Sequence, residues 1–313
     1  MKILFMGTPD FALPTLEAIY NSSDTLVGVI TQPDKPKGRG YVLAPPPVKV
    51  FADAHGIPVY QPTTLRSDES IGLIKKLAPD MIVVVAYGKI LPPALLEIPP
   101  MGCVNVHGSL LPKYRGAAPM QRAIIEGEKV TGVTTMYMAE GLDTGDMLLS
   151  AKLPISPEDN FETVHDSLAK LGAKLLIKTV EGLKSGTVKR TAQDDSLATY
   201  AAKIEKSDCM IDFSCSANTV HDLVRGLSPV PLAFTHTPDG KLLKIIKTSV
   251  SARDNGGAAP GTVIALEEAK GFFTVACGEG ALDIHALLPE GKGRMSAGDF
   301  IRGRKISEGD ILA

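Results

Sequence analysis

The first half of the chain alternates two kinds of hydrophobic pattern. Short runs of consecutive apolar residues have the length of buried strands, whereas longer segments repeat an apolar residue every three or four positions, as amphipathic helices do. The expected strands are residues 2–6, 26–31, 59, 81–87, 103–107, 132–138 and 147–153. The expected helices are residues 11–20, 48–55, 68–77, 120–126 and 159–184. This alternation predicts an α/β domain with a mostly parallel sheet that is covered by helices.

The pattern changes after residue 186. Residues 187–207 are rich in Thr, Lys, Arg, Gln, Asp and Ala without a hydrophobic period, so we expect a linker over the surface. Short strands broken by turn residues follow, at 210–213, 232–236, 242–248, 261–266, 272–277 and 281–288, with helices at 217–225 and 297–302. This spacing predicts a small antiparallel β-barrel. The chain therefore divides into a first domain at 1–186, a linker at 187–207 and a second domain at 208–313.

Composition limits the possible classes of function. At 313 residues with 44% hydrophobic and 22% charged residues, the chain is long enough for two folded domains. A net charge of -2 gives no overall attraction to nucleic acid, so any such binding requires a local basic patch. No apolar run is long enough to cross a bilayer or to form a signal peptide, and we expect a cytoplasmic protein. The four cysteines are not spaced as disulfide or zinc motifs, so no metal site is expected.

The first predicted strand and helix are joined by a turn that begins at Gly7. A dinucleotide-binding turn has three glycines spaced as Gly-x-Gly-x-x-Gly, because its backbone must approach a pyrophosphate. Only Gly7 is present here, and Pro9 and Phe11 occupy positions where that motif needs permissive residues. We therefore expect a Rossmann-like fold without its nucleotide site.

Candidate catalytic residues lie in the strand at 103–107. Residues two apart in a strand share a face, so Asn105 and His107 present an amide and an imidazole side by side while Val104 and Val106 point into the core. At the carboxyl end of a parallel strand, both groups would lie where open α/β sheets bind ligands. The alternative is a buried polar pair that only satisfies neighbouring backbone. A loop rich in hydrogen-bonding groups follows His107 and favours a site.

Asp143 lies in Gly-Leu-Asp-Thr-Gly-Asp, between two predicted strands. Asp, Thr and Gly are common in turns for conformational reasons alone, so turn formation is the simpler explanation. The functional alternative is a carboxylate that orients a histidine and stabilises its charge. The other histidines are expected to be structural or exposed, without converging polar neighbours: His55, His165, His221, His236 and His285.

Residues 32–40, Gln-Pro-Asp-Lys-Pro-Lys-Gly-Arg-Gly, form a basic segment rich in proline and glycine. A solvated loop is the simpler explanation. Its positive charges close to the predicted crevice also make contact with nucleic acid or phosphate a candidate role.

These motifs resemble one known family. Val-Asn-Val-His-Gly-Ser-Leu-Leu-Pro-Lys-Tyr-Arg-Gly-Ala-Ala-Pro and Gly-Leu-Asp-Thr-Gly-Asp are similar to the motifs of the folate-dependent formyltransferases. Phe-Met-Gly-Thr-Pro-Asp-Phe-Ala, the basic segment and the second domain are similar to the branch that acts on methionyl-tRNA. The resemblance covers essentially the whole chain and is sharper in the first domain.

The resemblance implies formyl transfer from 10-formyltetrahydrofolate to the methionine amino group of initiator tRNA, for translation initiation. The implied catalytic residues are Asn105, His107 and Asp143. The implied folate-contacting residues are Ser109, Leu110, Leu111 and Pro112. The implied tRNA-binding residues are Lys35, Lys37 and Arg39, and the second domain is implied to be an OB-like barrel that holds the tRNA.

The expected partners are initiator methionyl-tRNA and the folate formyl donor, with no membrane, no obligate protein partner and a monomeric chain. Two alternatives remain open at this stage. The same three side chains would serve another primary amine, such as glycinamide or a nucleotide-linked amino sugar. A non-catalytic RNA-binding protein of the same fold is the second, and the intact Asn105, His107 and Asp143 argue against it.

Overall fold

The computed structural model describes residues 1–37 and 42–313, which form two compact units. Unit 1 comprises Met1–Gly116, Val130–Pro154 and His165–Ala201. Unit 2 comprises Ala117–Lys129, Ile155–Val164 and Ala202–Ala313. These units differ from the contiguous division around residues 187–207 that the sequence predicts. Ala117–Lys129 and Ile155–Val164, which the sequence places in the first domain, belong to unit 2. Most of the predicted linker, up to Ala201, belongs to unit 1.

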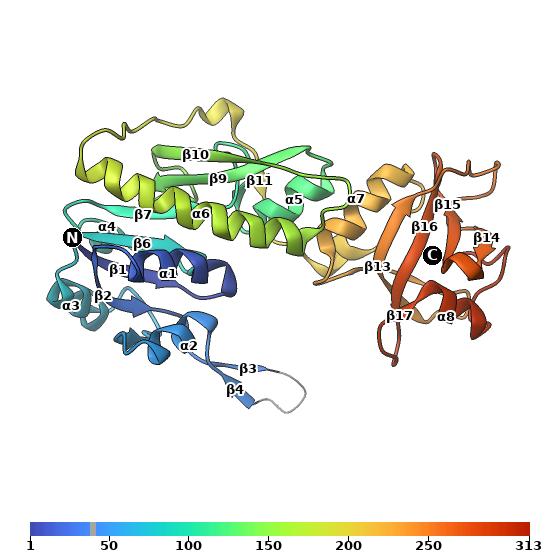
Figure 1. The fold of residues 1–313 in the computed structure, drawn as a ribbon, viewed down its shortest axis with the longest axis horizontal. Coiled ribbons are helices and arrows are strands. Elements are labelled where there is room, and N and C mark those ends of the chain that lie inside the picture. The colour runs from blue at the N-terminus through green and yellow to red at the C-terminus, as the bar shows by residue number, and fades with distance from the viewer. Residues whose placement is uncertain (38–41) are drawn as a thin grey trace. The chain divides into compact units, whose positions relative to one another are not determined.

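Unit 1 is centred on a seven-stranded sheet in the order β10-β9-β7-β6-β1-β2-β5 (Figure 1). Its strands are β1 (Lys2–Gly7), β2 (Thr25–Ile30), β5 (Val59–Tyr60), β6 (Met81–Val85), β7 (Cys103–His107), β9 (Val130–Tyr137) and β10 (Met147–Pro154). The strands from β7 to β5 are parallel, whereas β9 and β10 are antiparallel additions at one edge. The prediction of a mostly parallel, Rossmann-like sheet is confirmed.

Helices cover both faces of this sheet, and the alternation of each strand decides which residues meet them. The helices are α1 (Leu13–Tyr20), α2 (Pro47–Ala54), α3 (Asp68–Leu77), α4 (Pro93–Leu96) and α6 (Phe161–Lys184). A cluster of buried side chains joins α3 and α4 to the strand face that carries Leu4, Ile82 and Cys103. On the opposite face α6 crosses the sheet (Figure 1), and a Cβ on Gly172 would lie 2.9 Å from Val106. Glycine therefore lets α6 approach β7 closely.

The order of strands reverses next to β1, with β2 and β5 on one side of it and β6 and β7 on the other. Ligands of open α/β sheets bind beyond the carboxyl ends of strands at such a position. A Cβ on Gly7 would lie 2.9 Å from the Val85 carbonyl oxygen, so this glycine is required by the packing of strand ends. Beyond them, Thr8 Oγ1 and Gln32 Nε2 both donate to the Tyr87 carbonyl at 3.1 Å.

Helix α6 begins slightly later than the helix expected at 159–184. Asn160 Oδ1 accepts from the Thr163 backbone N–H at 3.0 Å, which satisfies a free amide of the first turn. Asp159 Oδ2 instead accepts from the Ser156 N–H at 2.8 Å in the preceding turn. The helix therefore starts at Phe161, two residues after the expected start, because Asn and Asp are both good caps and the sequence alone does not separate adjacent candidates.

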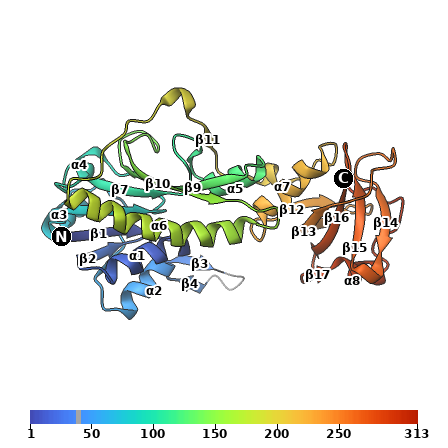
Figure 2. The same cartoon turned by 45° about the horizontal axis from the view of Figure 1, so that its top comes forward.

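Unit 2 is built on an antiparallel sheet with the path β12-β13-β16-β15-β14 and with β17 paired to β16 (Figure 2). Its strands are β12 (Ala233–His236), β13 (Leu242–Val250), β14 (Val263–Glu267), β15 (Phe272–Ala276), β16 (Ala281–Pro289) and β17 (Met295–Ser296). Helices α7 (Ala217–Leu227) and α8 (Ala297–Arg302) pack against its core. The predicted antiparallel second fold is confirmed, but the strand expected at 210–213 makes only one bridge, between Met210 and Phe234.

Close helix packing explains why an early segment belongs to unit 2. Helix α5 (Pro119–Ile125) contacts α7, and a Cβ on Gly226 would lie 2.7 Å from the Ile125 side chain. Ile125 packs against the buried core of unit 2. No helix among the residues that the structure describes is both long and apolar enough to cross a membrane.

Two histidines of unit 2 have polar partners that the sequence did not predict. His221 Nδ1 lies 3.0 Å from Thr248 Oγ1, and His285 Nε2 lies 2.7 Å from Ser249 Oγ. Both partners are on β13, so adjacent residues of one strand engage a histidine each. The expectation that these histidines lack converging polar groups was wrong, because their partners come from β13, which is distant from both in the sequence.

These contacts predict a loss of stability in mild acid. Burial lowers the pKa of His221 below its usual 6.5, so below that pH the unfolded chain binds more protons than the folded one. The free energy of unfolding should therefore fall as the pH drops below about 6.5, with a slope of at most about 1.4 kcal/mol per pH unit from this group. Urea unfolding of the wild type and of His221→Gln between pH 8 and pH 5 measures this. The variant should show a shallower fall, and parallel curves would contradict the prediction.

Candidate active site

Strand β7 presents the two polar side chains that the sequence singled out. It pairs in parallel with β6, and His107 is its last residue, so both side chains lie near the carboxyl ends of parallel strands. Val104 and Val106 are buried on the opposite face, while Asn105 is half-buried. The expected alternation along this strand is confirmed.

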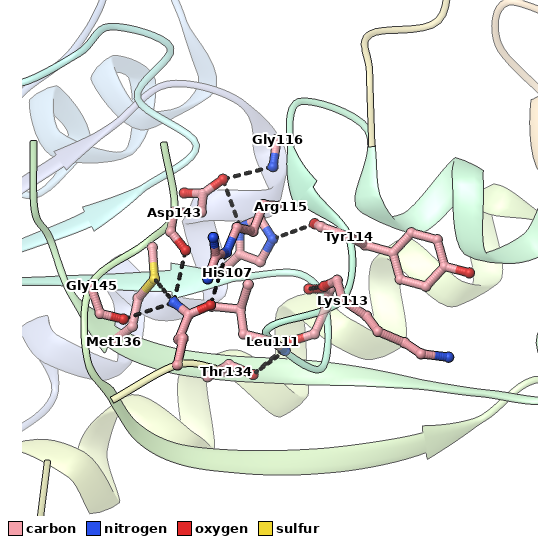
Figure 3. A network of polar contacts seen from close by, with 12 residues as sticks. His107, Leu111, Lys113, Tyr114, Arg115, Gly116, Thr134, Met136, Asp143 and Gly145 are labelled. Carbon is pink, nitrogen blue, oxygen red and sulfur yellow. Dashed lines mark hydrogen bonds and ion pairs between the residues drawn. The ribbon is translucent and has the colours of Figure 1, made fainter. Parts of the chain in front are cut away.

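The His107 ring is held between a carbonyl and a carboxylate (Figure 3). Its Nε2 lies 2.9 Å from the Tyr114 carbonyl oxygen, and its Nδ1 lies 3.7 Å from Asp143 Oδ2. A carbonyl only accepts hydrogen bonds, so Nε2 carries a hydrogen and donates to Tyr114. His107 can therefore exchange a proton with a ligand only through Nδ1, which faces the carboxylate.

Asp143 is oriented toward this histidine by more than its turn. Its backbone has φ of 53°, in the left-handed region that few residues other than glycine adopt. Asp143 Oδ2 accepts a hydrogen bond of 2.8 Å from the Gly116 N–H, which lies after the loop that follows β7. The carboxylate thus connects the turn between β9 and β10 to the far end of the loop that follows β7, which a role in turn formation alone does not require.

Asn105 supplies a free amide beside these groups. Among residues 1–37 and 42–313, no group hydrogen-bonds to its side chain, although the residue is half-buried. An amide N–H next to a histidine can stabilise a negative oxygen that forms during a reaction, and the His107 and Asp143 pair can hold a proton. The arrangement suits attack on a carbonyl-type carbon.

The loop after β7 is stabilised from within. Ser109 is buried, and its Oγ donates to the Lys113 carbonyl at 2.6 Å. The Leu111 N–H donates to Thr134 Oγ1 at 3.2 Å, and Leu111 is also buried. Of the predicted folate-contacting residues, only Leu110 and Pro112 are half-buried, so they are the more accessible side chains of this loop.

Comparison with known proteins identifies the family. Residues 1–180 match the family described as formyl transferase, and residues 203–305 match the formyl transferase C-terminal domain. The chain belongs to the formyl transferase family. It is 50% identical over 312 residues to a methionyl-tRNA formyltransferase of Geotalea uraniireducens (strain Rf4), covering 100% of this chain and 98% of that protein. It is also 50% identical over 311 residues to a methionyl-tRNA formyltransferase of Trichlorobacter lovleyi (strain ATCC BAA-1151 / DSM 17278 / SZ), covering 99% and 96%.

Solved structures agree on the fold. An N-formyltransferase from Helicobacter canadensis, in complex with folinic acid and dTDP-3-aminofucose, superposes with a TM-score of 0.66 at 19% identity, covering 91% of this chain and 98% of that one. HypX from Aquifex aeolicus in complex with tetrahydrofolic acid superposes with a TM-score of 0.63 at 17% identity, covering 100% of this chain and 50% of that one. At this level of identity, the similarity shows a shared fold.

The site of this formyl transferase includes a segment that the sequence did not associate with it. Residues predicted as a surface linker form β11 (Tyr200–Ala201), which pairs in parallel with β8 (Arg115–Gly116). Thr191 exchanges backbone hydrogen bonds with Met147, at the start of β10. The segment has no hydrophobic period because polar and backbone contacts attach it, so periodicity could not have revealed its position.

Arg115 connects this segment to the site. Its side chain is buried, with Nε donating to Gln193 Oε1 at 3.0 Å and a terminal nitrogen donating to Asp195 Oδ1 at 2.7 Å. Burial alone would lower the pKa of Arg115, but its pairing with Asp195 and Tyr200 raises the pKa instead. Arg115 belongs to the motif after β7, and no pattern in the sequence connects it with Gln193.

The basic segment at 32–40 contains a short strand where the sequence predicted a loop. Residues Lys35–Lys37 form β3, which pairs with β4 (Val42–Ala44) as an antiparallel hairpin. Asp34 precedes it and accepts from Lys49 Nζ at 2.9 Å and from Gln61 Nε2 at 2.7 Å. Lys35 is exposed, whereas the predicted Arg39 lies outside the described residues.

Proposed function

We propose that this formyl transferase moves the formyl group of 10-formyltetrahydrofolate to the methionine amino group of charged initiator tRNA. The observation that carries the proposal is the arrangement at the end of β7, where the free Asn105 amide lies beside His107 and Asp143 Oδ2 lies 3.7 Å from His107 Nδ1. The relatives that are 50% identical over nearly their whole length are named for this substrate, which supports methionyl-tRNA as the acceptor.

The reaction assigns a role to each of the three side chains. The amine nitrogen attacks the formyl carbon, a carbon–nitrogen bond forms, and negative charge develops on the formyl oxygen. Asn105 donates a hydrogen bond to that oxygen, and His107 donates through Nδ1 when that nitrogen is protonated. Asp143 stabilises the ring and helps to remove the amine proton, directly or through water. The bond from the formyl carbon to the folate nitrogen then breaks, and the proton passes to the departing tetrahydrofolate.

We propose that the loop after β7 receives the formyl donor. Ser109 is engaged with Lys113, so its hydroxyl contributes by holding the loop in shape. Leu110 and Pro112 offer the half-buried apolar surface that a folate ring requires, and Leu111 anchors the loop through Thr134. The tRNA-binding roles of Lys35, Lys37 and Arg39 rest on their charge and on the resemblance of the segment, and the second domain is proposed to hold the tRNA.

A direct assay tests the proposal. The protein is incubated with labelled 10-formyltetrahydrofolate and with methionine-charged initiator tRNA, and elongator tRNA and a nucleotide-linked amino sugar serve as parallel acceptors. Label should appear on the initiator methionine and on neither control. Transfer to the sugar alone would replace the proposed acceptor, and absence of transfer to any acceptor would reject the function.

The basic hairpin leads to a prediction about salt dependence. Replacing Arg39 by Ala, or Lys35 by Ala, should weaken use of charged tRNA and reduce the salt slope of tRNA affinity by roughly 0.7 to 1 per removed phosphate contact. Folate affinity should not change. Lys76→Ala removes an exposed positive charge from α3 and serves as the matched control. Loss of folate binding in the Arg39 variant would contradict this role and would move the hairpin to the donor site.

A further inference from the structure

We infer that Gln193 is a positioning residue for Asp143, an inference that rests on the proposed function. The Gln193 side chain donates from Nε2 to two carbonyl oxygens of the same turn, that of Asp143 at 2.8 Å and that of Gly145 at 2.7 Å. Figure 3 labels both residues, and of the two it shows Asp143 close to His107. Gln193 thus hydrogen-bonds to the backbone carbonyls on both sides of Thr144. One of them belongs to Asp143, whose carboxylate faces His107.

The hydrogen-bonding capacity of the Gln193 amide is used in one orientation only. Its two N–H groups meet carbonyl oxygens, which only accept, and its Oε1 meets Arg115 Nε, which only donates, at 3.0 Å. If the amide were flipped, its oxygen would face the two carbonyl oxygens and its N–H groups would face the Arg115 N–H, so none of the three hydrogen bonds could form. Buried Arg115 therefore fixes the orientation of Gln193, which in turn fixes the turn that carries Asp143.

Asp143 needs such support because its backbone conformation is unfavourable. A non-glycine residue at φ of 53° is strained and persists where surrounding contacts define it. Within residues 1–37 and 42–313, the Asp143 carboxylate accepts a hydrogen bond from the Gly116 N–H, and its backbone carbonyl accepts one from Gln193 Nε2. These two hydrogen bonds hold Asp143 at its side chain and at its backbone. Small displacements of a catalytic group can cost about a hundredfold in rate.

The position of Gln193 separates this role from general stabilisation. Gln193 is only half-buried, and its segment lacks a hydrophobic core of its own. Loss of its hydrogen bonds should affect the turn more than the global fold, since a typical net hydrogen bond contributes only about 1 kcal/mol to stability. The rate of the chemical step should be more sensitive than the unfolding temperature.

Two variants test the inference. Gln193→Met keeps an unbranched side chain of similar length without polar groups, and Gln193→Glu keeps an acceptor for Arg115 but loses both donors. Each should lower kcat for initiator methionyl-tRNA about tenfold or more, with KM for tRNA and for the formyl donor changed less than threefold. Asp194→Asn, an exposed neighbour in the same segment, is the matched control and should retain wild-type kcat.

A double-mutant cycle with Asp143→Asn, measured in single turnover, distinguishes positioning from a structural effect. If Gln193 acts through the Asp143 carboxylate, Gln193→Met should cause little further loss of kcat in the Asp143→Asn background. Multiplicative losses would overturn the inference, as would wild-type kcat in either Gln193 variant. The wild-type reaction separates this result from the proposed function, because a wild type that formylates no initiator tRNA rejects that function instead.

Discussion

Replacing Asn105 by Ala is expected to lower the turnover rate of formyl transfer by about a hundredfold or more. The Asn105 amide has no partner among the described residues, so its hydrogen-bonding capacity is available to a substrate. A donor that is aimed at a developing negative oxygen stabilises the transition state more than the bound substrate, so the loss should appear in kcat rather than in binding. Single-turnover formylation at saturating substrates gives the rate, and equilibrium binding of charged tRNA gives the affinity.

The matched control is the same substitution at Asn21, an exposed residue at the end of α1. Asn21→Ala should retain the wild-type rate and tRNA affinity. Because Asn105 is half-buried in β7, thermal unfolding of both variants verifies that the sheet is intact. An unchanged rate in a folded Asn105→Ala protein would remove the residue from the chemistry.

Gly145→Ala is expected to disable the site by displacing the turn that carries Asp143. A Cβ on Gly145 would lie 1.8 Å from the Tyr137 carbonyl oxygen, a distance that no backbone tolerates without moving. The shift would also disturb the carbonyl of Gly145 that accepts from Gln193. We expect kcat to fall about a hundredfold and the free energy of unfolding to fall by about 1–3 kcal/mol. Steady-state kinetics and urea unfolding measure the two effects.

Gly141→Ala provides a control within the same turn. The three atoms nearest to its added Cβ all belong to the Thr144 side chain and none to the backbone, so kcat and stability should fall much less than in Gly145→Ala. Equal losses in the two glycine variants would show that any substitution in this turn is harmful, and would contradict the specific clash at Gly145.

Hydrophobic periodicity predicted the framework of both units because burial of an apolar face acts locally and leaves a repeat in the sequence. The strands from β1 to β10 that build the main sheet and most strands of unit 2 follow such repeats. Two short strand pairings were not predicted. Strands β8 and β11 pair over two residues each, and β3 and β4 pair over three residues each. Both pairings lie outside the main sheets of the two units, and strands of two or three residues there bury too little apolar surface to produce a period.

The division into units followed contacts that are distant in the sequence. The α5 helix was expected from its pattern, but its place in unit 2 depends on the close approach of Ile125 to Gly226. Likewise, the segment at 187–201 belongs to unit 1 because Thr191, Gln193 and Tyr200 meet backbone and polar partners there. Composition alone predicted a linker, because polar side chains and an absence of period are also what a linker has.

The sequence by itself determined that Asn105 and His107 share one face at the end of a strand, since side chains of an extended chain alternate with a period of two. Its motifs also sufficed to show the resemblance to the formyltransferases. Only the tertiary structure decided that Asp143 lies 3.7 Å from His107 and that Gln193 holds the turn of Asp143. These polar contacts join segments that are distant in the sequence, and no local pattern records which distant group becomes the partner of which.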